Sequence, residues 1–306
     1  MNARVVDSPP KEPVRILLNE IIDYAGLFPP SQVSMSEAVL NYATYLHSNY
    51  GWMLGRFVLP VSRLDEFYES AKEFLPRGRA STWKLSVLAG EDINATVRSI
   101  VEFNRKHSDR VTADTLEVKA NTVSKIENTI SLLPKAITPY FEIATTGRTF
   151  VDLVATLGIK RLRAKIRTGG VTREEFPATR DIIRFVRTCM AANVPFKATA
   201  GLHHPIRCFK PLTYAPDAPQ GTMHGFLNML LMTGFARESF RVSLLEEIME
   251  EEFEEVFEFS DGAVSWRGSH TLTLSHLDRL RVRGMQSFGS CSFDEPVADL
   301  QEMGGL

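Results

Sequence analysis

Short apolar or β-branched segments alternate with helical patterns along the middle of the chain, and this alternation restricts the fold more than any other feature. The candidate strands cover residues 56–61, 83–89, 115–120, 137–143, 161–168 and 196–201. The helical patterns cover residues 64–74, 93–107, 123–133, 149–157 and 174–192. Strands that alternate with helices at this spacing predict βαβ units, because parallel neighbours need a crossover connection. We therefore expect a parallel sheet of the α/β class.

The length of the chain favours a closed sheet. A (β/α)8 barrel uses about 250 residues, so 306 residues accommodate one barrel with additions. Six β/α units are clear, and the pattern becomes irregular after residue 201. We expect a hairpin around Ser260-Asp261-Gly262 and a last strand and loop within residues 285–293. An open doubly wound sheet is the alternative, although the first βα connection lacks the GxGxxG of dinucleotide-binding sheets.

The chain is accordingly divided into an N-terminal extension, residues 1–50, and a TIM-like barrel, residues 51–306, irregular in its last two strands. The extension should contain a loose arm (1–13), a short helix (14–22) and an amphipathic helix (35–47) that Ser34 caps. Asp23 and Tyr24 lie near Pro29-Pro30 in a turn-rich segment. That segment is either a lid over the barrel or a structural turn.

Composition excludes several classes of function. A net charge of -2, from 35 basic and 37 acidic residues, argues against nucleic acid and anionic membranes as partners. Three cysteines without a CxxC motif favour reduced thiols. No apolar run reaches 18 residues, and the N-terminus has no signal-peptide pattern. We expect a soluble cytoplasmic protein that acts on a small molecule, with a homo-oligomer left open.

Charged residues alternate with apolar ones along four consecutive strands, so one face of each strand is apolar and the other charged. The charged faces carry Glu117, Lys119, Glu142, Lys165, Arg167 and Lys197. Burying one unpaired ion costs several kcal/mol, and a purely structural barrel interior would be aliphatic. These residues therefore form either a buried ion-pair network that fixes strand register or the mouth of an active site. The excess of cations predicts a substrate with a phosphate or carboxylate group.

Two lysine segments carry a resemblance to a known family. They read Ala164-Lys165-Ile166-Arg167-Thr168-Gly169-Gly170 and, on the next strand, Phe196-Lys197-Ala198-Thr199-Ala200-Gly201. Residues 160–207 resemble the consecutive active-site strands of class I aldolases of the deoxyribose-phosphate aldolase type, where K-T-S-T-G carries the Schiff-base lysine and K-P-A-G-G a second lysine. Elsewhere, AGLHHPIR, HGFLN and FGSCSFDEP are similar to parts of bacterial barrel-like proteins of unknown activity.

The resemblance implies roles for individual residues. Lys165 would attack a carbonyl group, and Lys197 would be the neighbouring cation that lowers the pKa of that amine. Glu117 or Glu142 would stand in for the family's catalytic aspartate. Independently of the family, a lysine is a nucleophile only when deprotonated, which burial and a nearby cation both favour.

Further polar residues at predicted strand ends are candidates for binding the anion or moving protons. His203 is a candidate for proton transfer, and Gly169-Gly170 form a turn whose backbone N–H groups could bind an anion. The remaining candidates for anion binding are Lys119, Arg167, Thr199, His204, Arg207, His224, Asn228 and Ser290. Cys291 lacks a histidine partner that the sequence defines, which disfavours it as a nucleophile.

Three functional hypotheses follow. The first is a lyase of the aldolase type that acts on a small phosphorylated or carboxylated carbonyl compound without a cofactor. The second is a metal-assisted lyase, isomerase or hydrolase that uses His203, His204 and Glu142, although neither HxH nor HExxH occurs. The third is a non-catalytic sensor or scaffold that binds a metabolite in the same mouth.

Overall fold

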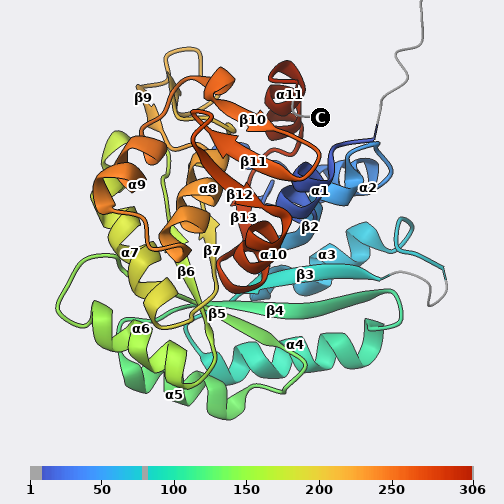
Figure 1. Ribbon diagram of the computed structural model, residues 1–306. Coiled ribbons are helices and arrows are strands. Elements are labelled where there is room, and N and C mark those ends of the chain that lie inside the picture. The colour runs from blue at the N-terminus through green and yellow to red at the C-terminus, as the bar shows by residue number, and fades with distance from the viewer. Residues whose placement is uncertain (1–8, 78–81, 305–306) are drawn as a thin grey trace, which may run out of the picture.

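Eight parallel strands close into a barrel at the centre of the protein (Figure 1). A computed structural model describes residues 9–77 and 82–304. Around the barrel the strands follow the order β1-β13-β7-β6-β5-β4-β3-β2. Their bounds are β1 Ile22–Tyr24, β2 Leu54–Pro60, β3 Trp83–Leu88, β4 Val111–Lys119, β5 Thr138–Glu142, β6 Arg163–Arg167, β7 Phe196–Thr199 and β13 Met285–Ser290. The prediction of a (β/α)8 TIM-like barrel is confirmed, and the open doubly wound sheet is excluded.

Helices surround the barrel, and neighbours in the chain pack against one another (Figure 1). They are α2 Met35–Leu46, α3 Leu64–Ala71, α4 Ile93–His107, α5 Val123–Leu132, α6 Phe150–Ile159, α7 Thr179–Ala191, α8 Phe226–Arg237 and α10 Leu274–Arg283. Capping side chains fix where several begin: Ser34, Asp92 and Thr122 each accept a hydrogen bond from a first-turn N–H. The predicted cap of the helix at residues 35–47 is thus confirmed.

The first barrel strand lies in the segment that the sequence analysis assigned to an N-terminal extension. β1 pairs with both β2 and β13, so the barrel begins at Ile22 and the predicted boundary at residue 51 is wrong. The helix expected over residues 14–22 is α1, Glu12–Leu18, which packs against α10. β1 has three residues, too few to show an alternating pattern. Most of the arm predicted for residues 1–13 lies outside the described residues.

A long insertion separates β7 from β13, which explains why the pattern becomes irregular after residue 201. It contains the hairpin β8 Cys208–Pro211 and β9 Gln220–Met223, the helices α8, α9 (Val242–Met249) and α10, and the antiparallel sheet β10 Phe257–Phe259, β11 Ala263–Trp266 and β12 His270–Thr273. The predicted hairpin is the β10–β11 pair. The predicted last strand is β13, and α11, Asp294–Glu302, follows it.

The apolar core lies between the strands and the helices. Phe141, Ile166 and Phe196 are fully buried, and Phe185 of α7 packs edge-on against Phe196 with ring centroids 5.4 Å apart. The residues that alternate with them point into the barrel and are largely polar. The predicted division into an apolar outer face and a charged inner face is therefore confirmed. None of the helices in the described ranges is long and apolar enough to cross a membrane.

Candidate active site

A cavity of about 340 Å³ opens at the C-terminal ends of the barrel strands. Residues at or near the C-terminal ends of all eight strands line it, among them Ala25, Val58, Leu88, Lys119, Glu142, Arg167, Thr199 and Gly289. One side is apolar, with Phe28, Pro29, Val58 and Leu88, and the other is charged. Catalytic sites of TIM barrels occupy this end of the fold.

Five charged residues form a continuous chain of ion pairs beneath and along the cavity; we call them the interior charge cluster. They are Asp23, Glu117, Glu142, Lys165 and Lys197. Lys165 Nζ lies 2.6 Å from Glu117 Oε2 and 2.8 Å from Glu142 Oε2. Lys197 Nζ lies 2.6 Å from Glu117 Oε1 and 2.5 Å from Asp23 Oδ2. Glu117 thus bridges the two lysines.

Strand register brings three of the five residues, Glu142, Lys165 and Lys197, to the same height in the barrel. Lys165 is the direct cross-strand partner of both Lys197 and Glu142. Side chains of alternate residues share a face, so all three point inward. The sequence-based expectation that the two lysines converge inside a closed sheet is confirmed.

Opposite charges decide the protonation of the buried groups. Burial alone would raise the pKa of Glu117, but the Lys165 and Lys197 ammonium groups outweigh it and hold that pKa well below its usual range. Burial alone would lower the pKa of Lys197, but Asp23 and Glu117 outweigh it and raise that pKa above its usual range. Lys197 is therefore a fixed cation matched by two carboxylates.

Only one of the two lysines reaches the cavity. Lys165 lines the cavity wall together with Glu117 and Glu142, whereas Lys197 does not. Lys197 is 1% exposed, with its ammonium group 5.6 Å from the ring centroid of Tyr140. Of the two lysines, Lys165 is therefore the one whose amine a molecule bound in the cavity can contact.

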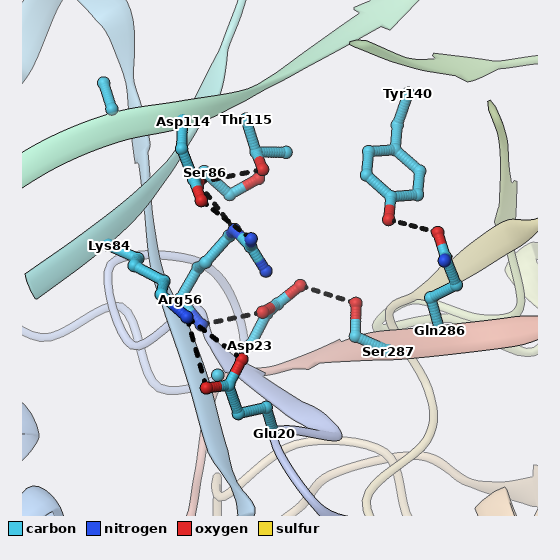
Figure 2. Close-up of polar contacts among 12 residues, drawn as sticks. Glu20, Asp23, Arg56, Lys84, Ser86, Asp114, Thr115, Tyr140, Gln286 and Ser287 are labelled. Atoms are coloured by element: carbon cyan, nitrogen blue, oxygen red, sulfur yellow. Dashed lines mark hydrogen bonds and ion pairs between the residues drawn. The ribbon is translucent and has the colours of Figure 1, made fainter. Parts of the chain in front are cut away.

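More polar contacts continue below the cluster toward the other end of the barrel (Figure 2). Figure 2 shows Arg56 paired with Asp114, where the nearest N–O distance is 2.7 Å, and the Tyr140 hydroxyl donating to Gln286. These contacts, like the cluster, cross from one strand to another. Such polar contacts fill the part of the barrel interior where aliphatic side chains are typical of the fold.

Asp23 is the cluster residue that sequence reasoning missed. The sequence predicts that it lies in a lid or a structural turn, whereas it lies in β1 and is 1% exposed. Its carboxylate also accepts hydrogen bonds from the Ser287 hydroxyl and the Arg56 backbone N–H, both at 2.8 Å (Figure 2). Ala25, Phe28 and Pro29 of the same turn-rich segment, which follow the strand, line the cavity. The sequence does contain one signal for this site: Asp23 stands between the apolar residues Ile22 and Tyr24.

The charge balance of the mouth differs from the expectation. We expected an excess of cations from Lys119, Lys165, Arg167 and Lys197 over two glutamates. The structure adds the carboxylates of Asp23, in the cluster, and Glu175, on the cavity wall. Four cations therefore meet four carboxylates in the cavity wall and the interior charge cluster taken together, so the excess of cations is smaller than the sequence predicts.

The glycine turn after β6 holds a carboxylate of the protein itself. Glu175 accepts hydrogen bonds from the backbone N–H groups of Val171 and Thr172, at 2.8 and 3.1 Å. A Cβ on Gly170 would lie 2.3 Å from that carboxylate. The anion nest predicted at Gly169-Gly170 is thus filled internally.

Gly169 has a packing function at the same turn. Gly201, at a φ of +75°, lies so close that a Cβ on it would come within 2.7 Å of the Gly169 Cα. Two glycines therefore allow the ends of β6 and β7 to touch. Thr199 lines the cavity as predicted, and its carbonyl accepts a hydrogen bond from the Thr168 N–H at 2.9 Å.

The two adjacent histidines pair with carboxylates of α11. His203 lines the cavity, and its Nδ1 lies 3.2 Å from Glu295 Oε2. His204 Nδ1 lies 2.5 Å from Asp299 Oδ2, and this histidine lines a separate surface pocket. Glu142 is engaged by Lys165 instead. Among the described residues no group of three or more His, Cys, Asp or Glu side chains is placed to hold a metal ion.

Cys291 does have a histidine neighbour, which the sequence could not reveal. Its Sγ lies 4.0 Å from His203 Nδ1 at the cavity wall. Burial would raise the pKa of the Cys291 thiol, but His203 outweighs it and lowers that pKa. Burial would likewise lower the pKa of His203, but Cys291 and Glu295 outweigh it and raise that pKa to about 9.

Four other candidate residues have structural contacts away from the cavity. Asn228 accepts a hydrogen bond from the Arg207 N–H and donates to the carbonyls of Ile248 and Glu251. The Arg207 guanidinium pairs with Glu252 at 2.5 Å.

His224 is buried, with Nε2 2.9 Å from the Pro177 carbonyl. The Ser290 hydroxyl accepts a hydrogen bond from the Ser292 N–H. None of the four lines the cavity, so their predicted contact with the substrate is not supported.

No protein-family model matches the chain, and no curated protein is detectably similar to it. Its function must therefore be inferred from the geometry of the site.

Proposed function

We propose that the protein is a lyase of the aldolase type that binds a small anionic carbonyl compound as an imine on Lys165. One observation carries the proposal: Lys165 is a 3%-exposed amine at a cavity wall that contacts two carboxylates. A lysine in this setting has a proton acceptor at hand and little water to compete for the substrate. The segment that contains Lys165 also carries the local resemblance to class I aldolases.

The first chemical step is attack of the neutral amine on the carbonyl carbon. The Lys165 ammonium must first lose a proton, and the Glu142 oxygen at 2.8 Å is the available acceptor, because the two lysines hold the pKa of Glu117 well below its usual range. The amine then adds to the carbonyl to give a carbinolamine, and the acid returns the proton to the hydroxyl group. Water leaves, and a protonated imine remains on Lys165.

The second step breaks a carbon–carbon bond. The protonated imine draws the electron pair of the bond between its α and β carbons, which leaves an enamine and a carbonyl fragment. A carboxylate takes the proton of the β hydroxyl group as this bond breaks and then protonates the enamine carbon. Hydrolysis of the resulting imine restores Lys165. We assign the proton transfers to Glu142, which contacts the Lys165 amine, and a positioning function to Glu117, which the two lysines keep ionised.

Lys197 has a positioning function in this scheme. It is held by Asp23 and Glu117 and does not line the cavity. Its positive charge keeps Glu117 ionised, and its contacts fix the carboxylate beside Lys165. This differs from direct repulsion of Lys165, the function that the resemblance implied, because Glu117 lies between the two ammonium groups.

Hydrogen–deuterium exchange of carbonyl compounds tests the proposal. The purified protein is incubated in D2O with acetaldehyde, pyruvate or dihydroxyacetone phosphate, and loss of α-proton signals is followed by NMR. We expect exchange for at least one compound, abolished by Lys165→Met and reduced by Glu117→Gln. The control Lys84→Met changes an exposed lysine of β3 and should behave like the wild type. Exchange that persists in Lys165→Met would refute the assigned function, whereas ligand-dependent stabilisation without exchange would favour a sensor.

The same proposal includes the cellular setting. All three cysteines, Cys189, Cys208 and Cys291, are free thiols, which supports a reducing compartment such as the cytoplasm.

A further inference from the structure

A second hollow continues the cavity outward over the ends of β4, β5 and β6. It has a volume of about 590 Å³, and we call it the outer groove. Its polar lining includes Lys119, Asn121, Lys125, Thr145, Thr146 and Arg167. The cavity and the outer groove share Lys119, Glu142, Arg167 and Glu175. A molecule bound at Lys165 can therefore extend into the groove.

Cations of the outer groove are available to a ligand. Within the described residues, Lys119 and Lys125 form no ion pair, and the nearest carboxylate contact of Arg167 is 3.9 Å, from its Nε to Glu142 Oε1. Two of the carboxylates that line the groove are engaged elsewhere: Glu142 by Lys165 and Glu175 by two backbone N–H groups. The third is Glu174. The outer groove thus presents three cations and one carboxylate, that of Glu174, which is not engaged by another group named here.

The cations on the opposite side of the mouth already face carboxylates of the protein. TIM barrels often bind phosphate at the last two strands. Here the ends of β7 and β13 lie beside α11, whose Glu295 contacts His203 and the Tyr214 hydroxyl and whose Asp299 contacts His204. An anion at that side would compete with Glu295 for His203 and with Asp299 for His204, and the glycine turn after β6 is filled by Glu175. Charge therefore directs an anionic group toward the outer groove.

We propose that the substrate is a phosphorylated carbonyl compound whose terminal phosphate binds in the outer groove between Lys119, Lys125 and Arg167. The three oxygens of one phosphate can accept charge-assisted hydrogen bonds from all three side chains. Lys125 lies in the first turn of α5, so the backbone N–H groups at the start of that helix add positive potential. The assignment of the carbonyl end to Lys165 rests on the proposed function; the phosphate site itself does not depend on it.

Titration with inorganic phosphate, followed by the 31P NMR linewidth, tests the site directly. We expect saturable binding to the wild-type protein, weakened about tenfold in Lys125→Ala and in Lys119→Ala, the effect of losing one charge-assisted hydrogen bond. The matched control Lys210→Ala removes a cation of the separate surface pocket beside α11, 3.7 Å from Asp299, and should leave binding unchanged. Lys165→Met should also bind phosphate, so failure of the imine chemistry leaves this result intact.

Three outcomes would overturn the proposed phosphate site. One is absence of saturable phosphate binding to the wild-type protein. Another is unchanged affinity in both groove variants, and the last is a loss in Lys210→Ala as large as that in Lys125→Ala.

Discussion

Replacing Lys197 by methionine should destabilise the protein strongly. The side chain is 1% exposed, and its ammonium group contacts Asp23 at 2.5 Å and Glu117 at 2.6 Å. Methionine keeps most of the volume but leaves both carboxylates without this cation. Removing one partner of a buried ion pair costs about 3–5 kcal/mol. We expect a value near the lower end, because Glu117 keeps Lys165 and Asp23 keeps two hydrogen bonds.

The pH dependence of this loss has a definite sign. In the wild type the pKa of Glu117 is lowered, so its contribution is present above the unfolded value of about 4.3 and is lost as pH falls further. In Lys197→Met both carboxylates lose this cation while they stay buried, so protonation costs less for them than in the wild type. The stability deficit relative to the wild type should therefore be largest at pH 8 and should shrink by pH 5.

Urea unfolding followed by tryptophan fluorescence at pH 8 and pH 5 measures both effects. The control Lys84→Met removes an exposed pair with Glu20 and should change the free energy of unfolding by about 0–1 kcal/mol. Adding Asp23→Asn to Lys197→Met neutralises one stranded charge and should recover part of the loss. A Lys197→Met protein as stable as the control, or a deficit that does not depend on pH, would refute this reasoning.

Three further predictions concern residues around the site. Cys291 should react with iodoacetamide faster than Cys208, because burial raises the pKa of the Cys208 thiol to about 11. His203→Ala should slow the alkylation of Cys291 severalfold. Mass spectrometry of timed samples measures both rates. Asn228→Ala should lower the free energy of unfolding by about 2–3 kcal/mol, because three buried backbone groups lose a partner, while exchange activity per folded molecule stays the same. Gly201→Ala should cost about 2 kcal/mol or more in urea unfolding, because φ is +75° and the new Cβ meets Gly169.

Each of these predictions has a direct counter-result. Equal alkylation rates for Cys291 in the wild type and His203→Ala would show that the histidine does not activate the thiol. Loss of exchange activity in folded Asn228→Ala would contradict a purely structural function of this residue. For Gly201 the matched control is Gly262→Ala, where a Cβ meets nothing within 4 Å; equal stability of the two variants would contradict the packing argument.

Much of the barrel could be predicted because its signals are local. The strands from β2 to β7 carry alternating or apolar patterns over several residues, and the lysines and glutamates that interrupt them were correctly assigned to the interior. β1 could not be found in this way, because three residues show no period and their strand character depends on pairing with β2 and β13. Asp23 was missed for the same reason.

Contacts between distant segments could not be predicted from the sequence. His203 meets Glu295 and Cys291 only because an insertion of more than 80 residues returns the chain to the barrel at β13. Arg207 and Asn228 lie in the segments AGLHHPIR and HGFLN and were candidates for anion binding, yet both make contacts that hold the insertion together. Glu175 filled the predicted anion nest, which reading the glycines alone could not reveal.

Reductive trapping of a carbonyl compound on Lys165 tests the central claim most directly. The protein is treated with sodium borohydride in the presence of the carbonyl compound that shows exchange, and the modified residue is located by peptide mass spectrometry. We predict one adduct, on Lys165, that is absent from Lys165→Met. No adduct, or an adduct spread over surface lysines and unchanged in Lys165→Met, would contradict the proposed chemistry.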